Sequence, residues 1–356
     1  MNAVKSGNWS DPTVWDLNRV PIAGDPVLIP AGISVTYDVL SNDVLTGVDI
    51  MGVLKFSRAA STRLKTSKNI VVMMGGFLDT GTPMDFIPPA IRAEIIFVMA
   101  PNTVFIGGPG FQALDTGLWV MDGGRWESHG APILRSWGKL GADAIAGVSE
   151  VTLQKSAYDW FLGGQVLITS TDNPSESRQP ILPSPRIRDE LKTITAITPL
   201  PGGRTNITLN SPLVFTHLGT EPFQGEVALL YRNVLVRTEI TGVSDGTLDS
   251  TPSQRTGAHT MFMMGAMGNV RYTEFKYLGH YSTKGRYPIH THMMVDSSRG
   301  MVIKGNTSWM SGNRQINIHA SNGILLEDNV GYNCAGSAVF LEFEPALNAI
   351  SLMQNV

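Results

Sequence analysis

Cysteine is nearly missing from this chain: Cys334 is the only one among 356 residues. A lone cysteine has no partner within the chain, so an internal disulfide is excluded. Eukaryotic ectodomains of this size usually carry disulfides, because the environment outside the cell is oxidising. The composition therefore favours a bacterial or viral source.

Long apolar runs are missing as well. No stretch approaches the ~20 consecutive apolar residues that a membrane helix needs, so we expect no membrane span. Residues 1–11 also lack the apolar core of a signal peptide. We therefore expect either that a signal was trimmed or that the protein leaves the cell by another route, for example as part of a virion.

An excess of positive charge is missing too, since the formal net charge is −3 at pH 7. Such a chain has no general attraction to nucleic acid, so no nucleic-acid partner is expected. Within residues 271–314, however, seven basic residues stand against two acidic ones, a local net charge of +5. This run indicates either a surface that binds an anionic polymer or an ordinary solvated face.

Glycine and proline, by contrast, are abundant, with 37 Gly and 21 Pro, and this leaves little room for long helices. Short apolar segments alternate with turns over residues 1–125 and predict a β-rich module. Residues 126–225 gather tryptophans and glycines and predict a small linking β domain. The length and the 42% of hydrophobic residues suit two or three folded units.

From residue 226 onwards, β-rich segments recur at intervals of roughly 23–31 residues, with Gly or Asn turns between them. Asparagines at Asn306, Asn322 and Asn329 are typical of coil corners. The pattern predicts a parallel β-helix over residues 226–356. A coil left open at Val356 would expose a sheet edge, so we expect the natural chain to continue, or a partner or further chain to cap it. The oligomeric state stays open.

Several N-terminal stretches closely resemble the G8 domain. The opening runs from Trp9 to Trp15 (WSDPTVW) and from Pro21 to Gly32 (PIAGDPVLIPAG), followed by Tyr37-Asp38. The later pieces Leu64–Thr66 and Gly75–Leu78 fit the same pattern.

A second set of motifs lies near the C-terminus. Residues 285–292, GRYPIHTH, resemble the Gly-Arg-Tyr-Pro-Ile-His-Phe-His signature of the cell-surface hyaluronidase family, that of transmembrane protein 2 and the cell-migration-inducing hyaluronan-binding protein. Ile318–Gly323, Asp328–Tyr332 and Phe340–Glu342 are similar to further stretches of that family. Thr291 departs from it by replacing an aromatic residue.

The resemblance implies an all-β fold, with a G8 module, a small β domain and a right-handed parallel β-helix. It also implies an acidic, hyaluronan-type polysaccharide as substrate and a place outside the cell or on a cell or virion surface. An arginine and acidic residues of the G8 module would contribute to catalysis, and the nearest matches are Arg19, Asp25 and Asp38. A plainer role is open to both carboxylates, since Asp25 lies in a turn and Asp38 ends a strand.

Histidines gather in the recurring segments. His290 and His292 share one face of a strand, because side chains alternate along it. His319 follows His292 by 27 residues and Glu342 follows His319 by 23, so each step fits one coil. Stacking would then collect these side chains, with His259 as a further candidate, into a ligand set for a divalent metal ion. Zinc, nickel or manganese suits imidazoles better than calcium does; a metal-free polar ladder or groove is the alternative.

Other side chains could act on a saccharide. Glu342 and Glu344 share a strand face and could supply the carboxylate pair that glycoside hydrolysis needs. Tyr287 and Trp309 could stack on sugar rings, although burial in a core is the commoner fate of such residues.

Two arginines stand close before the histidines. Arg286 precedes His290 by four residues, and Arg314 precedes His319 by five. A guanidinium in this place could hold a uronate carboxylate through two parallel hydrogen bonds. A salt bridge to Glu274 or Asp296 is the alternative.

Three functions fit these residues. The leading one is a hyaluronidase-like glycosidase that cleaves an acidic polysaccharide along the β-helix. The second is a non-catalytic binding or structural module, such as an adhesin or a phage tail spike. The third is a polysaccharide lyase, with His290 as base and Arg286 neutralising the uronate. The histidines favour an enzyme, and the missing signal favours a binding module; the fold alone decides none of them.

Overall fold

The computed structural model describes residues 1–171, 188–245, 248, 255–342 and 351–353. The chain forms two compact units. The larger unit combines residues 1–132 with residues 232–355, and the smaller one comprises residues 133–231. No helix among the described residues is long and apolar enough to cross a membrane.

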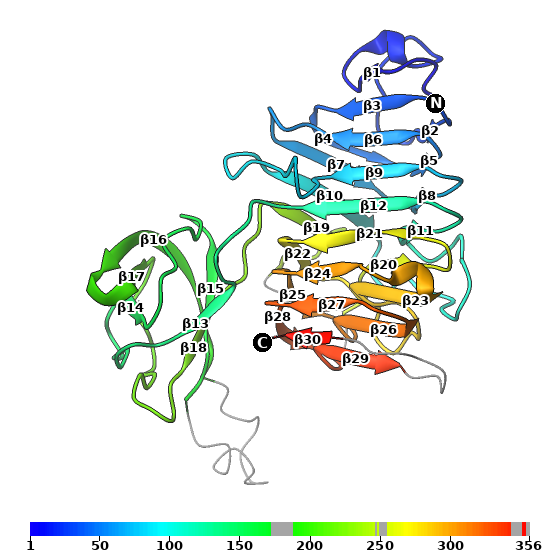
Figure 1. Ribbon diagram of the computed structural model, residues 1–356. Coiled ribbons are helices and arrows are strands. Elements are labelled where there is room, and N and C mark those ends of the chain that lie inside the picture. The colour runs from blue at the N-terminus through cyan, green and yellow to red at the C-terminus, as the bar shows by residue number, and fades with distance from the viewer. Residues whose placement is uncertain (172–187, 246–247, 249–254, 343–350, 354–356) are drawn as a thin grey trace. The chain divides into compact units, whose positions relative to one another are not determined.

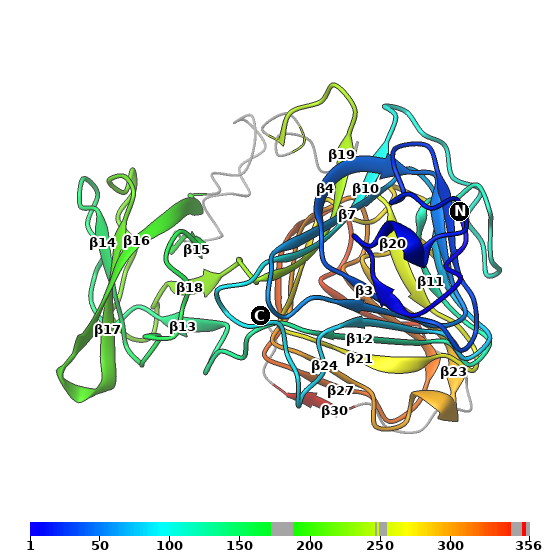
Figure 2. The same ribbon diagram turned by 90° about the horizontal axis from the view of Figure 1, so that it is seen from above.

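The larger unit is a parallel β-helix built from three sheets (Figures 1 and 2). Sheet I contains β2 (Pro26–Ile29), β5 (Gly47–Ile50), β8 (Ile70–Val72), β11 (Gly117–Val120), β20 (His259–Phe262), β23 (Ile289–Val295), β26 (Ile316–Ser321) and β29 (Val339–Glu342). Sheet II contains β1 (Gly7–Asn8), β3 (Ser34–Tyr37), β6 (Val53–Phe56), β9 (Phe77–Thr80), β12 (Arg125–His129), β21 (Met267–Arg271), β24 (Val302–Lys304), β27 (Leu325–Glu327) and β30 (Ser351–Met353). Sheet III contains β4 (Leu40–Leu45), β7 (Thr62–Thr66), β10 (Ala93–Met99), β19 (Val234–Ile240), β22 (Thr273–Lys276), β25 (Thr307–Ser311) and β28 (Val330–Cys334). The described part of this unit also contains the short 3₁₀ turns η1 (Pro12–Val14) and η5 (Asp296–Ser298).

The chain visits sheets I, II and III in turn, and each round is one coil. We number the coils by their sheet I strand: β2 begins coil 1, β20 coil 5, β23 coil 6 and β29 coil 8. Alternate side chains of every strand point inward, because side chains alternate across a strand. In sheet I the inward row is buried and mostly apolar, for example Leu118, Phe262 and Ile289, with Thr260 and Thr291 as polar members.

Two corners repeat from coil to coil. The turn from sheet I to sheet II reads Met-x-Gly-Gly at Met73–Gly76 and Met121–Gly124, and Met-x-Gly-Ala at Met263–Ala266. A Cβ on Gly124 would lie 2.2 Å from the Val72 carbonyl oxygen, so this close approach of two coils requires glycine. At the corner before sheet III, Asn306 donates to the Asn329 side chain, 3.0 Å away, in agreement with the predicted asparagine corners.

The organisation differs from the expected three consecutive parts. Strands of residues 1–125 do not form a separate module, because β10, β11 and β12 pair in parallel with β19, β20 and β21. They are the first coils of the same β-helix. The domain expected at residues 126–225 exists as residues 133–231, but it is inserted between β12 and β19 and links no two modules.

The inserted unit is an antiparallel six-stranded sheet. Its strands, in spatial order, are β13 (Trp137–Lys139), β18 (Glu226–Leu229), β15 (Gln165–Ile168), β16 (Glu190–Leu200), β17 (Arg204–Leu209) and β14 (Glu150–Leu153), with the short turn η3 (Pro201–Gly203) between β16 and β17. The side chain of Glu190 is buried and accepts backbone hydrogen bonds from Val214 and Phe215. These bonds tie a loop to the sheet.

Candidate metal and saccharide site

Three histidines meet on the outer face of sheet I. His290 and His292 come from β23, and His319 comes from β26 in the next coil. His292 pairs in register with His319, and His319 pairs with Glu342 of β29. The coil spacing predicted from the 27- and 23-residue separations is therefore confirmed. The inward neighbours of these residues anchor the strands in the core, so the outward positions are fixed by the fold.

The three imidazoles are close enough to share one ion. One nitrogen of each lies within 4.8 Å of the others, and the Nδ1 atoms of His292 and His319 are 2.9 Å apart. Two ligands of a tetrahedral ion with bonds of about 2.0 Å lie roughly 3.3 Å apart. The set therefore fits a single ion after a small inward movement of His290.

His290 is oriented as a metal ligand would be. Its Nδ1 lies 3.0 Å from the Gly285 carbonyl oxygen, to which it donates, so Nε2 carries the free lone pair. That Nε2 is buried and has no hydrogen-bond partner among the described residues. A ligating histidine commonly donates its other N–H to a carbonyl in this way. The unsatisfied buried nitrogen is the observation that an ion would explain.

Burial keeps two of these imidazoles neutral. It lowers the pKa of His290 well below the usual value, and neighbouring His292 lowers it further. Burial, followed by the charge of His319, lowers the pKa of His292 to about 4. Neutral imidazole is the form that binds a metal, so both groups are ready as ligands at neutral pH.

An open pocket of about 430 Å³ adjoins the histidines and is lined by Lys284, Tyr287, Arg314 and Glu342, among others. The Arg314 guanidinium stacks over the Phe340 ring at 3.5 Å and lies 3.8 Å from the Glu342 carboxylate. Lys284 is 3.5 Å from the same carboxylate. The pocket therefore combines two cations, a carboxylate and the edge of Tyr287.

Glu342 is ionised at neutral pH. Burial by itself would raise its pKa, but the hydrogen bond from Asn317 and the charges of His319 and Lys284 outweigh burial and lower it. An ionised carboxylate can accept a proton or bind a cation, and it cannot donate a proton as a general acid does. Glu344, the expected second member of this pair, lies outside the described residues.

Arg286 is not placed to bind a substrate, which corrects the expectation from its sequence position. Its side chain is 0% exposed, and Nε donates to Asp115, also 0% exposed, over 2.8 Å. Asp115 in turn accepts from the backbone N–H groups of Ile106 and Gly107. The pair therefore ties the loop before β11 to the loop before β23. Sequence reasoning missed Asp115, because it lies 171 residues from Arg286.

His259 does not join the metal cluster. It is fully buried among the rings of Trp119 and Phe105, and its Nδ1 lies 3.1 Å from the Thr116 carbonyl oxygen. The reason is register: Phe262 pairs with Thr291, so the outward residues next to the histidines are those that flank Phe262.

Trp309 does not lie where it could stack on a sugar at the histidine site. It lies on β25 of sheet III, is buried, and donates through Nε1 to Glu274 at 3.2 Å. Tyr287, by contrast, lines the pocket and contacts His290 edge to face at 4.9 Å. Of the two aromatic candidates, only Tyr287 belongs to the site.

The acidic candidates of the first coil lie far from the histidines. Arg19 grips Asp25 through two hydrogen bonds of 2.6 and 2.9 Å, and Asp38 accepts two from Ser10. Sheet I places β2 and β23 five strands apart, which is about 24 Å at about 4.8 Å per step. The predicted catalytic residues therefore form two separate groups within this chain.

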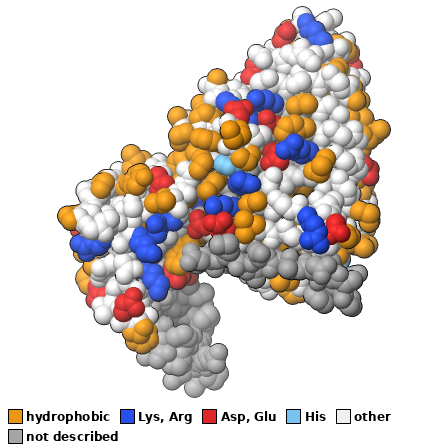
Figure 3. Space-filling view, in the orientation of Figure 1, with side chains coloured by type: hydrophobic (Ala, Val, Ile, Leu, Met, Phe, Trp, Pro, Cys, Tyr) orange, Lys and Arg blue, Asp and Glu red, His pale blue; other side chains and the backbone are white. Residues whose placement is uncertain are grey.

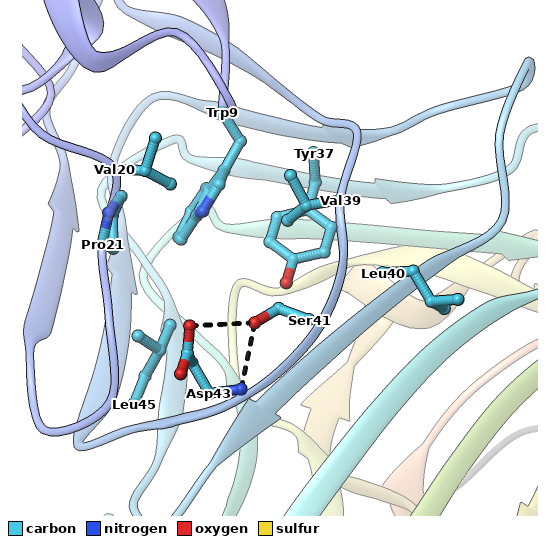
Figure 4. Close-up of a pocket in the computed structure, with 9 residues that line it drawn as sticks. All are labelled: Trp9, Val20, Pro21, Tyr37, Val39, Leu40, Ser41, Asp43 and Leu45. Atoms are coloured by element: carbon cyan, nitrogen blue, oxygen red, sulfur yellow. Dashed lines mark hydrogen bonds between the residues drawn. The ribbon is translucent and has the colours of Figure 1, made fainter.

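A small pocket lies beside the first coil, between strands β3 and β4 (Figure 4). Trp9 and Tyr37 form its aromatic side, and Ser41 donates to Asp43 at its polar side. Neither Asp25 nor Asp38 lines this pocket. It therefore does not unite the first-coil acids into a catalytic pair.

The basic run over residues 271–314 does not form one patch. Lys304 lies on sheet II in an ion pair, Lys276 lies on sheet III over an indole ring, and Arg286 is buried. Only Lys284 and Arg314 line the pocket. Figure 3 shows basic and acidic side chains interspersed on one face of the molecule. The local charge seen in the sequence is therefore divided over three sheets.

Two family models match this architecture. Residues 14–141, which include β2 to β12, match the G8 domain, and residues 255–344, which include β20 to β29, match the CEMIP β-helix. One part of the chain is thus similar to a G8 domain and another part to a CEMIP β-helix. The resemblance drawn from the N-terminal stretches and from GRYPIHTH is thereby confirmed.

Known proteins are similar to nearly the whole chain. A G8 domain-containing protein of Dictyostelium discoideum is 27% identical over 340 residues, 94% of this chain and 28% of that protein. Human fibrocystin-L is 26% identical over 372 residues, 94% of this chain and 8% of that protein. The tailspike gp61 of Pseudomonas phage phi297 is 11% identical with a TM-score of 0.28, over 93% of this chain and 41% of that one. The chain thus spans less than a third of the length of the Dictyostelium protein and of human fibrocystin-L.

Proposed function

We propose that the outer face of sheet I in coils 6 to 8 binds an acidic polysaccharide outside the cell or on a cell or virion surface, and cleaves it with the help of a metal ion. The unpartnered Nε2 of buried His290, beside His292 and His319, carries this proposal. The imidazoles would hold a divalent ion such as zinc, nickel or manganese. Such an ion would polarise a leaving oxygen or activate water.

The side chains around the cluster have separate roles in this proposal. Arg314 and Lys284 would hold a uronate carboxylate, because both cations are accessible from the pocket. Glu342 would accept a proton as an ionised base. Tyr287, which is buried, would form the wall of the pocket, and Arg286 would hold the loop that carries the Gly285 carbonyl.

Cleavage by hydrolysis and cleavage by elimination both fit this set. Hydrolysis in the usual form needs two carboxylates within about 10 Å, and in the described part of the chain the register places Glu342 beside the histidines. A lyase needs one base and one group that neutralises the uronate, roles open to Glu342 or a histidine and to Arg314. Among the described residues the site therefore offers a metal-assisted route to hydrolysis or elimination. A binding module without catalysis is the second candidate.

The test starts with elemental analysis of the purified chain and continues with size analysis of hyaluronan and a neutral glucan after incubation. We expect one bound ion and shortened hyaluronan, with ultraviolet absorbance of the products separating elimination from hydrolysis. His292→Ala and Glu342→Gln should abolish shortening, and Arg299→Ala, an exposed residue in an ion pair elsewhere, should not. Metal-loaded protein that binds acidic chains without shortening them would overturn the enzyme and support the binding module. Protein that ignores acidic chains would overturn both.

A further inference from the structure

One column of sheet I changes from methionine to histidine along the helix. The residue after each sheet I strand in coils 2 to 5 is methionine: Met51, Met73, Met121 and Met263. Their backbone N–H groups continue the ladder, since Met121 donates to the Val72 carbonyl and Met263 to the Val120 carbonyl, both over 2.9 Å. In coils 6 to 8 the same column is occupied by His292, His319 and Glu342.

Two thioethers therefore flank the two histidines of β23. Phe262 pairs with Thr291, which places Met261 beside His290 and Met263 beside His292 in adjacent coils. The motif Met-Phe-Met of coil 5 thus stands directly against the motif His-Thr-His of coil 6 (β20 and β23 in Figure 1). Met261 is buried against Val71 and Trp119, and Met263 is half-buried beside it.

The geometry allows a thioether to reach the same ion as the imidazoles. Adjacent strands are about 4.8 Å apart, and the unbranched methionine side chain has three rotatable bonds. Its sulfur can therefore close the remaining distance to an ion held by His292. His319 approaches from the opposite side, at 2.9 Å from His292.

Ligand softness decides which metal such a set prefers. Three imidazoles alone suit zinc or nickel, but a thioether is a soft ligand that selects Cu(I). We propose that the site takes copper, bound as Cu(I) by the histidine cluster together with the thioether of Met263. This inference rests on the proposed metal site and adds Cu(I) to the zinc, nickel or manganese that the site would bind.

Methionines of the same column offer a matched control. Met73 occupies the equivalent corner two coils away, is half-buried like Met263, and packs against the same apolar group of Val71 and Trp119. Replacement of either residue by leucine keeps the volume and removes the sulfur. A role in packing alone would make Met73→Leu and Met263→Leu equivalent.

The experiment titrates the full chain, reduced with ascorbate, with Cu(I) in competition with the chromogenic chelator bathocuproine disulfonate. We expect Met263→Leu to weaken Cu(I) binding about 10- to 100-fold. Met73→Leu should leave it within about twofold of the parent, and zinc binding should change little in both variants because zinc does not depend on the thioether. X-ray absorption at the copper edge should show a sulfur neighbour in the parent and only nitrogen or oxygen in Met263→Leu.

Equal Cu(I) affinities of the parent and Met263→Leu, or equal losses in both leucine variants, would overturn the copper assignment. So would a copper spectrum without sulfur. Zinc bound by the parent and lost in His292→Ala would in that case keep the proposed metal site intact. A parent chain that binds neither zinc nor Cu(I) would remove the proposed site itself.

Discussion

The two halves of the outer face of sheet I have one backbone geometry and two chemistries. In coils 2 to 5 the column holds methionines, and around Val71 and Trp119 the face is apolar. In coils 6 to 8 the same column holds His292, His319 and Glu342. The difference shows that a stacked coil fixes where a side chain stands, while the choice of residue at that place decides what the surface can bind.

Coil 1 and coil 6 also differ in whether their polar side chains have hydrogen-bond partners. In coil 1, Arg19 and Asp25 satisfy each other through two hydrogen bonds, and both oxygens of Asp38 are occupied by Ser10. In coil 6, Nε2 of His290 is buried without a partner in the described part of the chain. The ion pair of coil 1 needs no further partner. Nε2 of His259 in coil 5 is also buried and unpartnered among the described residues, but only His290 lies beside two further imidazoles that could share a ligand.

Replacement of a histidine in coil 6 by the methionine typical of coils 2 to 5 should have the largest effect, which is on metal binding. His292→Met continues the methionine column by one coil, and it removes a ligand whose neutral form the fold stabilises. We expect complete loss of bound zinc, nickel or manganese by elemental analysis, with an unchanged circular dichroism spectrum. His259→Gln, a histidine outside the cluster, should retain the ion. Retention of these ions by His292→Met would break the comparison.

The border between the halves is covered by the two loops that Asp115 and Arg286 tie together. Asp115→Ala leaves a buried guanidinium without its counter-charge, and we expect a loss of about 3–5 kcal/mol in unfolding free energy. Urea denaturation monitored by tryptophan fluorescence measures it. Arg299→Ala, which breaks an exposed pair with Asp296, should leave the midpoint nearly unchanged. Similar midpoints for both variants would contradict a covering role for the buried pair.

The register of the site could be predicted from the sequence, and the extent of the helix could not. Separations of 27 and 23 residues align His292, His319 and Glu342, because these coils are short and uninterrupted. The earlier coils escaped detection because residues 133–231 interrupt coil 4 and destroy the period. The repeated Met-x-Gly corners at Met73, Met121 and Met263 were the signal that could have found them.

The misplaced candidates share one cause. Arg286 was expected in a sugar-binding groove because it lies near His290 along the chain, and Trp309 because an indole can stack on a sugar, but each coil has three faces. Trp309 belongs to sheet III, and Arg286 is covered by a loop that begins after β10. Position along a coil therefore predicts the neighbour above or below more securely than it predicts the face or its exposure.

The ion pair of coil 1 should have a smaller effect, visible in acid. The Arg19 guanidinium lowers the pKa of Asp25 to about 2. A carboxyl group whose folded pKa is depressed stabilises the protein above its unfolded pKa of about 3.9, and this contribution is lost as pH falls towards 2. Because the Arg19 side chain is 39% exposed, solvent screens the pair, and we expect a contribution of about 1 kcal/mol. The parent should lose this difference in unfolding free energy relative to Asp25→Asn between pH 5 and pH 2.5. If the unfolding free energies of the parent and of Asp25→Asn change with pH in parallel, the Arg19–Asp25 pair contributes no stability and the contrast with coil 6 fails.

The smallest effects should come from the cations of the pocket. Lys284 and Arg314 are accessible and lie 3.5 and 3.8 Å from Glu342, so an anionic saccharide must compete with that carboxylate. We expect Lys284→Ala and Arg314→Ala each to weaken binding of a hyaluronan oligosaccharide by about fivefold at most, measured by calorimetry at 50 mM salt. The parent's affinity should fall as salt rises to 200 mM, because screening acts on both cations. Lys304→Ala, a cation of sheet II, is the control and should change nothing. An affinity that does not change with salt, or an equal loss of affinity in Lys304→Ala and Arg314→Ala, would contradict saccharide binding at sheet I. The histidine half would then be a metal site only.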